Sequence, residues 1–295
     1  MTINRLIVLT VATTCILTGT IGCGGTAGAQ RPFEAHSPIV DTAQTTCYDD
    51  SGEIAAPQPG EPFHGQDAQF SGLQPAYRDN GDGTVTDLNT DLMWRQDPGA
   101  KVTYDQAVAG ADGVSLAGYT DWRLPTIKEL YSLIRFDGVT MMTSAASAPY
   151  IDTDYLVFHY GDETGERFID AQYVSSTEYT STTMGGNHTV FGVNFADGRI
   201  KGYPAGGQGG PTKRFYCIYV RGPRGYGVND FADSGDGTVT DRATGLVWRQ
   251  ADSGEGMNRR EAPAYAEDLT LGGHSDRRLP NAKELQSIVD YTRSP

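Results

Sequence analysis

The chain has 295 residues, of which 38% are hydrophobic, so it is long enough to form two domains of ordinary size. Its formal charge of −14 at pH 7 argues against binding to nucleic acid, heparin-like polymers or anionic lipid headgroups. Its 37 glycines and 16 tyrosines favour turns and strands over long helices.

Residues 1–22 have the pattern of an export signal, because a short basic start precedes an apolar stretch at Leu6–Ile21. That stretch is too short and too often interrupted by threonine to be a good membrane span. Two processing sites remain open. Cys23 and the three residues before it resemble a bacterial lipobox, which predicts a lipid on Cys23, whereas residues 27–29 fit ordinary cleavage of a secreted protein. Both alternatives place the protein outside the cytoplasm.

The segment at residues 23–75 is predicted to be an extension or linker with little regular structure, because it is rich in Gly, Pro, Gln and acidic residues. Beyond the signal, the folded part contains two cysteines, Cys47 and Cys217. An oxidising compartment would allow a disulfide between them, and two buried thiols are the alternative. Neither lies in a CxxC or Cys/His pattern, so the sequence does not indicate a zinc site.

Two phrases each occur twice in the chain. The first reads YRDNGDGTVTDLNTDLMWRQ at Tyr77–Gln96 and FADSGDGTVTDRATGLVWRQ at Phe231–Gln250, 154 residues later. The second reads DWRLPTIKELYSLI at Asp121–Ile134 and DRRLPNAKELQSIV at Asp276–Val289, 155 residues later. Two motifs that recur in the same order and spacing indicate a duplicated folding unit. We expect the first unit at residues 76–222 and the second, incomplete unit at residues 228–295.

Each unit is predicted to begin with three short strands joined by turns, and the Gly-rich turn at Asn80–Gly83 is a strong hairpin signal. A helix follows in each unit at the second repeated phrase, where Thr126 with Glu129, and Asn281 with Glu284, form capping boxes. The apolar residues of this helix are predicted to form one buried stripe in each unit, made of Leu130, Leu133 and Ile134 in the first and Leu285, Ile288 and Val289 in the second.

After this helix the first unit is rich in predicted strands, at Tyr173–Tyr179, Thr189–Phe195 and Arg214–Arg221. The second unit has no counterpart of these strands. Either the sequence is truncated within the second unit, which we favour, or this unit borrows its missing strands from elsewhere.

The phrases GDGTVTD, GLVWRQ and WRLPTIKEL, with the TTCYD lead-in at Thr45–Asp49, resemble the Lcl C-terminal domain family over about residues 45–295. The family is named for the C-terminal module of a bacterial collagen-like adhesin. The resemblance implies an exported or surface protein, often a lipoprotein, without established enzymatic activity. The sulfated polysaccharides bound by that adhesin fit poorly with the acidic composition of this chain. The second copy also departs from the pattern, because Arg277 replaces Trp122.

The phrase RLPT-x-x-E-L is also similar to one in formylglycine-generating enzymes, which share the C-type-lectin-like fold. The resemblance therefore implies an α+β, C-type-lectin-like module in which two helices pack on a twisted antiparallel sheet, and this module would be duplicated. Because one fold hosts many functions, this analogy does not transfer catalysis.

Aspartates around the Gly-rich turns are candidate calcium ligands, because Ca²⁺ prefers several oxygen ligands. These candidates are Asp79, Asp82, Asp87, Asp233, Asp236 and Asp241. The phrase lacks the bidentate Glu of an EF-hand loop. The alternative is that these carboxylates accept hydrogen bonds from nearby backbone N–H groups and stabilise the turns.

A second set of residues is suited to contact a sugar, because aromatic rings stack on sugar faces and polar side chains bond hydroxyls. These candidates are Arg123, Tyr173, Tyr179, Asn194, Asp197 and Arg199. The alternative is that Arg123 pairs with a buried acid beside the helix cap and that the other five form an ordinary strand surface.

The sequence contains no GxSxG, HExxH or P-loop motif, and its five histidines are scattered, so we expect no enzymatic activity. The favoured function is an exported binding module of the cell envelope, such as an adhesin or glycan-binding lipoprotein. A lipid anchor would hold it at the outer membrane or cell surface, and otherwise it would be periplasmic or secreted. The first alternative is a structural or assembly protein that binds envelope proteins, and the least favoured is an enzyme of unknown reaction.

Overall fold

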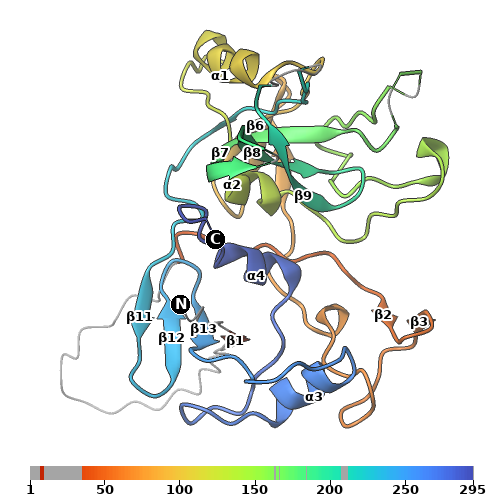
Figure 1. The fold of residues 1–295 in the computed structure, drawn as a ribbon, viewed down its shortest axis with the longest axis vertical. Coiled ribbons are helices and arrows are strands. Elements are labelled where there is room, and N and C mark those ends of the chain that lie inside the picture. The colour runs from red at the N-terminus through yellow and green to blue at the C-terminus, as the bar shows by residue number, and fades with distance from the viewer. Residues whose placement is uncertain are drawn as a thin grey trace, which may run out of the picture.

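The computed structural model describes residues 7–9, 35–162, 164–165, 167–183, 185–206 and 212–294. The predicted lipidation site at Cys23 and the alternative cleavage site at residues 27–29 lie outside these ranges. Figure 1 shows the first unit above the second, with the N-terminal extension beside the second unit. The molecule is mixed α+β, as predicted, with short helices and several small antiparallel sheets.

The first unit contains two antiparallel sheets and two α-helices. In its first sheet the strand order is β10-β6-β5-β4, formed by β4 (Tyr77–Asp79), β5 (Thr84–Asp87), β6 (Met93–Arg95) and β10 (Val220–Arg221). The second sheet consists of β7 (Gln172–Thr183), β8 (Asn187–Asn194) and β9 (Arg199–Pro204), in that order. The α-helices are α1 (Tyr104–Gly113) and α2 (Ile127–Ser132). A 3-10 helix, η2 (Ser144–Ala146), follows α2.

The second unit repeats the opening of the first. It contains β11 (Phe231–Asp233), β12 (Thr238–Asp241), β13 (Leu246–Arg249), α3 (Glu261–Asp268) and α4 (Ala282–Ser287). The strand register is also repeated, because Val85 lies opposite Trp94 and Val239 lies opposite Trp248. The predicted duplication of the hairpin phrase is therefore confirmed at the level of backbone pairing.

The capping boxes at α2 and α4 are confirmed. The side chain of Thr126 accepts a hydrogen bond from the backbone N–H of Glu129, and Asn281 does the same for Glu284. In both boxes the glutamate accepts a hydrogen bond from the N-cap backbone in return. The repeated phrase fixes the start of both helices because the cap residues are local in sequence.

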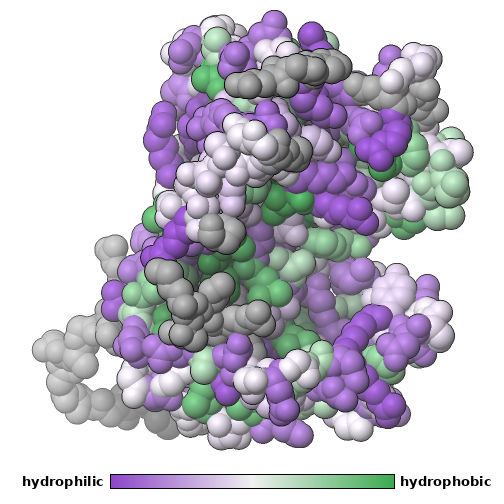
Figure 2. All heavy atoms as spheres, in the orientation of Figure 1, coloured by the Kyte–Doolittle hydropathy of each residue, from purple (hydrophilic) through white to green (hydrophobic). Residues whose placement is uncertain are grey.

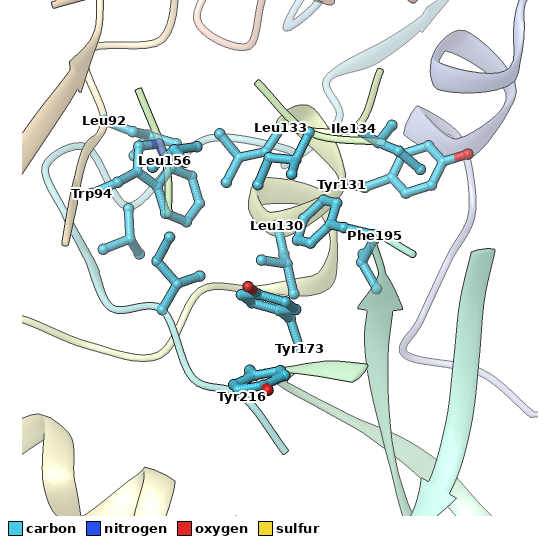
Figure 3. Packing of buried hydrophobic residues seen from close by; sticks show 14 of the residues in the cluster. Leu92, Trp94, Leu130, Tyr131, Leu133, Ile134, Leu156, Tyr173, Phe195 and Tyr216 are labelled. Atoms are coloured by element: carbon cyan, nitrogen blue, oxygen red, sulfur yellow. The ribbon is translucent and has the colours of Figure 1, made fainter. Parts of the chain in front are cut away.

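The main core lies in the first unit, where α2 packs against the second sheet (Figure 3). Leu130, Leu133 and Ile134 are fully buried there, as predicted. The equivalent stripe of α4 is only partly formed, because Leu285 is 45% exposed and Val289 is 42% exposed. The prediction is wrong for these two residues, because no sheet like β7–β9 covers this face of α4 among the described residues.

The N-terminal extension wraps onto the second unit and is not a free linker. Over the described residues 35–75 its helices and strands are β2 (Cys47–Tyr48), β3 (Glu53–Ile54) and the 3-10 helix η1 (Asp67–Gln69). The backbone N–H of Ser37 donates to the carbonyl oxygen of Ala243 at 2.8 Å. Arg259 donates to the carbonyl oxygen of Asp49 at 3.0 Å. Ile39 also packs against Leu246 and Trp248 in the small core of the second unit.

A short strand from the start of the chain completes the sheet of the second unit. β1 (Ile7–Leu9) pairs antiparallel with β13, at the edge that corresponds to the β10 edge of β6. β1 therefore stands at the position of β10 alone, and the described residues of the second unit include no counterpart of β7–β9.

The predicted disulfide between Cys47 and Cys217 is wrong, because both cysteines are buried free thiols. Cys47 lies on β2 of the extension, which folds onto the second unit, whereas Cys217 packs beside Tyr104 and Trp122 in the first unit. Burial raises the pKa of the Cys217 thiol to about 12. The two thiols therefore lie in different parts of the fold, and the sequence alone did not indicate this.

Figure 2 shows hydrophobic residues gathered around the junction of the two units, with hydrophilic residues over much of the remaining visible surface. No helix within the described ranges combines the length and the apolar character needed to cross a bilayer.

Candidate functional site

The first unit carries an open groove of about 370 Å³ between α1, the segment before α2 and β7. Its lining includes Tyr104, Val108, Arg123, Thr126, Ser176 and Arg224. α1 is fixed against the core by buried Tyr104, Ala107 and Ala111, which leaves Val108 on its exposed side. The groove therefore combines an apolar wall with hydroxyl and guanidinium groups.

Arg123 is the predicted ligand residue that lines this groove, but its guanidinium is already bonded to protein groups. Nη1 and Nη2 donate to the two carboxylate oxygens of Glu129 at 2.7 and 2.6 Å, and Nη2 also donates to the carbonyl oxygen of Pro223 at 3.2 Å. Glu129 is buried, so this pair fixes the segment before α2 to the helix cap. Arg123 thus has the structural role that the sequence offered as the alternative.

The second unit has the same arrangement around Arg278. Its guanidinium donates to Glu284, and the two side chains line a hollow of about 520 Å³ that the extension partly covers. Asp67 and Phe70 of the extension face this hollow, and burial raises the pKa of the Asp67 carboxyl. The equivalent arginines therefore border hollows in both units. The groove of the first unit is lined by that unit and by Arg224, which follows it in the chain, whereas the extension lines part of the hollow in the second unit.

A chain of three polar side chains begins at the groove residue Tyr104. The Tyr104 hydroxyl donates to Glu178 Oε1 at 2.9 Å, and His188 Nε2 lies 2.9 Å from Glu178 Oε2. The hydrogen bond with His188 is the main reason why the pKa of the Glu178 carboxyl is lowered. Sequence reasoning missed all three residues, because they lie on α1, β7 and β8 and share no motif.

Two of the predicted sugar-contacting residues are buried and have no access to a ligand in this structure. Tyr173 packs edge-on against Phe195, with ring centres 5.0 Å apart, and its ring lies near that of Tyr216 (Figure 3). Asn194 is also fully buried, and its Nδ2 donates to the carbonyl oxygen of Ile169 at 2.7 Å. Tyr173 lies opposite Val193 and Asn194 lies opposite Gln172, so the two side chains are on opposite faces of the second sheet. Both faces are covered at these positions, so the prediction is wrong for both residues.

The remaining predicted ligand residues do not converge on the groove. Tyr179 is partly buried and packs edge-on against Phe191. Asp197 forms an ion pair with Lys201 beside the turn between β8 and β9, where Arg199 is exposed. These residues follow the strands and the turn of the second sheet and do not surround a common cavity.

The predicted calcium site is not formed by the six aspartates, because they stabilise turns. Asp79 accepts a hydrogen bond from the N–H of Gly81 at 2.8 Å, and Asp233 does the same for Gly235 at 2.8 Å. Both glycines have positive φ, which explains why the turn requires glycine there. Asp82 and Asp236 bond the N–H and hydroxyl groups of the threonines two residues later.

The two buried aspartates have similar roles. Asp87 Oδ1 accepts hydrogen bonds from the backbone of Asn89 and Thr90, and Asp241 Oδ1 accepts from Asp230 and Ala243. Across residues 35–294, leaving aside the undescribed positions, no group of three His, Cys, Asp or Glu side chains is arranged to hold a metal ion. The structure therefore matches the alternative in which these carboxylates build turns.

A family model described as the Lcl C-terminal domain matches residues 83–221 and 237–295. No curated protein and no solved structure matches the chain. The two matched segments follow the two units seen in the structure and together cover more than half of the sequence. The protein therefore belongs to the Lcl C-terminal domain family.

Proposed function

We propose that the protein is an exported, non-catalytic binding module of the cell envelope and that it holds a glycan in the groove beside Arg123. Membership of the Lcl C-terminal domain family indicates a surface or adhesin-related module. The observation that carries the proposal is the open groove, in which polar groups border an apolar wall.

The groove has the mixture of groups that sugars require. Val108 is 47% exposed and offers an apolar surface to a sugar ring. Ser176 and Thr126 provide hydroxyl groups along the lining, and Arg224 adds an exposed cationic donor. Most of the Arg123 guanidinium is bonded to Glu129, so we assign it to shaping the groove and assign ligand contact to Arg224.

The proposal also includes a C-type-lectin-like fold for the first unit and a lipid anchor on Cys23. The two helices and antiparallel sheets of the first unit support a C-type-lectin-like arrangement. The lipobox-like sequence supports a lipid on Cys23 that anchors the protein to the outer membrane or cell surface. Incorporation of a labelled fatty acid, lost in Cys23→Ala, tests the anchor; secretion of an unlabelled chain would contradict it.

A glycan array, run with and without Ca²⁺, tests the binding proposal. We expect the wild-type protein to retain a set of glycans in both conditions, because the aspartates of the turns are bonded to protein groups. Arg224→Gln should weaken this binding roughly tenfold, the effect of losing one hydrogen bond to a charged group. Arg242→Gln is the matched control, since Arg242 is also exposed but lies in the second unit, outside the groove.

Two outcomes would contradict the proposal. Absence of glycan binding in both conditions would remove the glycan as ligand. Equal binding by Arg224→Gln and Arg242→Gln would show that the groove is not the site.

A second candidate function is an assembly protein that binds other envelope proteins. It is favoured by an exposed apolar loop next to η2, in which Val139 is 47%, Met141 53% and Met142 92% exposed. Flexible methionines on a surface suit contact with proteins. Crosslinking in intact cells would support this function if one partner dominates and is lost in Met141→Ser/Met142→Ser.

A further inference from the structure

Glu178 lies where β7 departs from regular pairing with β8. The register of the two strands shifts between Val174 and Glu178 and again between Glu178 and Thr182. Such irregularities bend a strand and redirect its side chains. Ser176 lines the groove of the first unit from this stretch, so the irregular part of β7 forms one wall of the groove.

The β7 wall is fixed to the start of α2. The backbone N–H of Ser176 donates to the carbonyl oxygen of Pro125 at 2.8 Å. The backbone N–H of Ile127 donates to Thr177 Oγ1 at 2.9 Å. Ile127 is buried, so these bonds hold the β7 wall against the core of the first unit.

α1 forms the opposite wall and is fixed to a different part of the unit. The Tyr219 hydroxyl donates to the carbonyl oxygen of Ala107 at 3.0 Å, which holds α1 against the last strand segment of the unit. Within the described ranges, α1 and β7 are joined by the hydrogen bond that Tyr104 donates to Glu178 at 2.9 Å. This bond therefore links the two walls of the groove.

The Glu178 carboxylate is held on its other side by His188 of β8. Nε2 of His188 lies 2.9 Å from Oε2 of Glu178, while Oε1 accepts the hydrogen bond from Tyr104. The side chains of Glu178 and His188 are 49% and 52% exposed, so the carboxylate has room to turn toward solvent. The state of His188 therefore influences how firmly Glu178 holds Tyr104.

Protonation of His188 strengthens this arrangement. Imidazole side chains change charge between about pH 5 and pH 8. In the protonated ring both nitrogens carry a hydrogen, so Nε2 donates to the carboxylate in a charge-assisted bond. The neutral ring has one N–H, so the bond weakens as the pH rises. The hydrogen bond with His188 lowers the pKa of the Glu178 carboxyl, which therefore stays ionised over this range.

In the described part of the chain, the other titratable groups around this pair belong to α1. They are Tyr104 and Asp105, whose charge acts on the Tyr104 hydroxyl. Burial is the main reason why the pKa of this hydroxyl is raised, so it remains a donor at neutral pH. Thr182 of β7 lies opposite His188, and the backbone N–H of Ala205 donates to the His188 carbonyl oxygen at 2.8 Å. Neither of these neighbours carries a titratable side chain.

We propose that Glu178 positions the two walls of the groove through Tyr104 and that His188 makes this positioning depend on pH. The inference rests on the proposed function of the groove. When His188 is protonated, Glu178 holds Tyr104, α1 keeps its distance from β7, and the groove binds its glycan most tightly. When His188 is neutral, the link between the walls loosens and binding weakens. The three side chains are positioning residues, and ligand contact remains with Arg224.

An NMR titration of the protein without ligand tests the link between the walls. The Val108 methyl groups report on the α1 wall of the groove. Their signals should shift with pH in step with the ring protons of His188. Tyr104→Phe removes the hydroxyl and keeps the ring, so His188 should still titrate in this variant while the coupled shift at Val108 disappears.

The glycan array, probed at about pH 5.5 and about pH 8.5, tests the effect on binding. Wild-type retention should be roughly threefold weaker at the higher pH, the size expected for one partly exposed ion pair. His188→Gln and Tyr104→Phe should each show equal retention at both pH values. His159→Gln is the matched control and should keep the wild-type difference, since His159 is also exposed and near a carboxylate, that of Asp97, but lies outside the groove.

Three results would overturn the inference. They are equal wild-type retention at both pH values, a Val108 signal that does not follow His188, and a pH difference that persists in Tyr104→Phe, which would mean that His188 acts without the link. In the first case a loss of binding in Arg224→Gln would leave the proposed function intact. Absence of glycan binding at both pH values would instead contradict the proposed function, and the ligand-free titration would still decide whether His188 acts on the groove.

Discussion

Lys128 and Lys283 hold equivalent positions in α2 and α4 and reach across the junction of the units in opposite directions. Lys128 Nζ donates to the carbonyl oxygen of Ser287 at 2.6 Å, and Lys283 Nζ donates to that of Ser132 at 3.0 Å. The two serines end α4 and α2, where carbonyl groups lack partners within the helix. The junction thus resembles the two-fold interface of a homodimer, formed here within one chain.

Lys283→Met should change the dependence of stability on pH. Burial lowers the pKa of the Lys283 ammonium to about 7, whereas the unfolded chain keeps the ordinary pKa of about 10.4. Between about pH 7 and about pH 10 the unfolded state therefore binds more protons, so this residue makes stability rise with pH. The slope it contributes is at most about 1.4 kcal/mol per pH unit.

Urea unfolding of both proteins across this range measures the effect. The free energy of unfolding of the wild type minus that of Lys283→Met should increase from pH 7 to higher pH. The subtraction removes groups common to both proteins, including the Cys217 thiol. Parallel pH profiles would show that Lys283 stays charged in the folded state.

The equivalent aspartates Asp87 and Asp241 should respond differently to replacement by asparagine. Asp241 Oδ2 accepts hydrogen bonds from Asn229 at 2.7 Å and Thr244 at 3.0 Å, and an amide NH₂ in its place would meet two donors. Asp241→Asn should therefore cost about 2 kcal/mol. Asp87 Oδ2 has no hydrogen-bond partner within the described ranges, and burial raises the pKa of this carboxyl.

Asp87→Asn should leave the free energy of unfolding at pH 7 unchanged or raise it slightly, because it removes a buried charge from a carboxylate whose Oδ2 has no hydrogen-bond partner within the described ranges. Denaturant unfolding of the two variants side by side is the measurement. A loss of stability in Asp87→Asn as large as that in Asp241→Asn would mean that the charge of Asp87 is needed at the junction.

Glu129→Gln should destabilise the first unit by about 3 kcal/mol, because it leaves the Arg123 guanidinium without its buried carboxylate and weakens the cap of α2. Glu284→Gln tests the equivalent pair with Arg278. Glu255→Gln, on the surface, is the control. Chemical unfolding should show clear losses for the first two variants only, and losses below about 0.5 kcal/mol would contradict the structural role assigned to these pairs.

Reducing agent should leave the unfolding midpoint unchanged, because Cys47 and Cys217 are separate buried thiols. Alkylation followed by mass measurement gives a direct count. The folded protein should react slowly, since burial disfavours the reactive thiolate at Cys217, and the unfolded protein should react at both residues without reductant. Protection of both thiols in the unfolded, unreduced protein would reveal a disulfide.

Features that depend on neighbouring residues could be predicted from the sequence. The hairpin glycines, the capping boxes and the duplicated strand register all follow from short phrases, because turn and cap chemistry acts over a few residues. The pairing of Arg123 with a buried acid was also within reach, since Glu129 lies six residues away on the capped helix.

Features that depend on which elements meet could not be predicted. Tyr173 was expected at a ligand surface, but the packing of α2 against the second sheet buries it. Asn194 was expected there too, but it is buried on the other face of that sheet, where it bonds the carbonyl oxygen of Ile169. Leu285 was expected inside, but no second sheet in the described part of the chain covers α4. Tyr104 and Glu178 meet across 74 positions of sequence, and no motif connects them.

The amino-acid sequence by itself determined that one folding unit is present twice, that it is α+β and that its helices begin at repeated caps, because these depend on contacts within a turn or two of the chain. Only the tertiary structure decided that the extension packs on both units, that the cysteines stay apart and that Tyr104, Glu178 and His188 meet. These outcomes depend on which surfaces are buried against each other, and burial is a property of the whole folded chain.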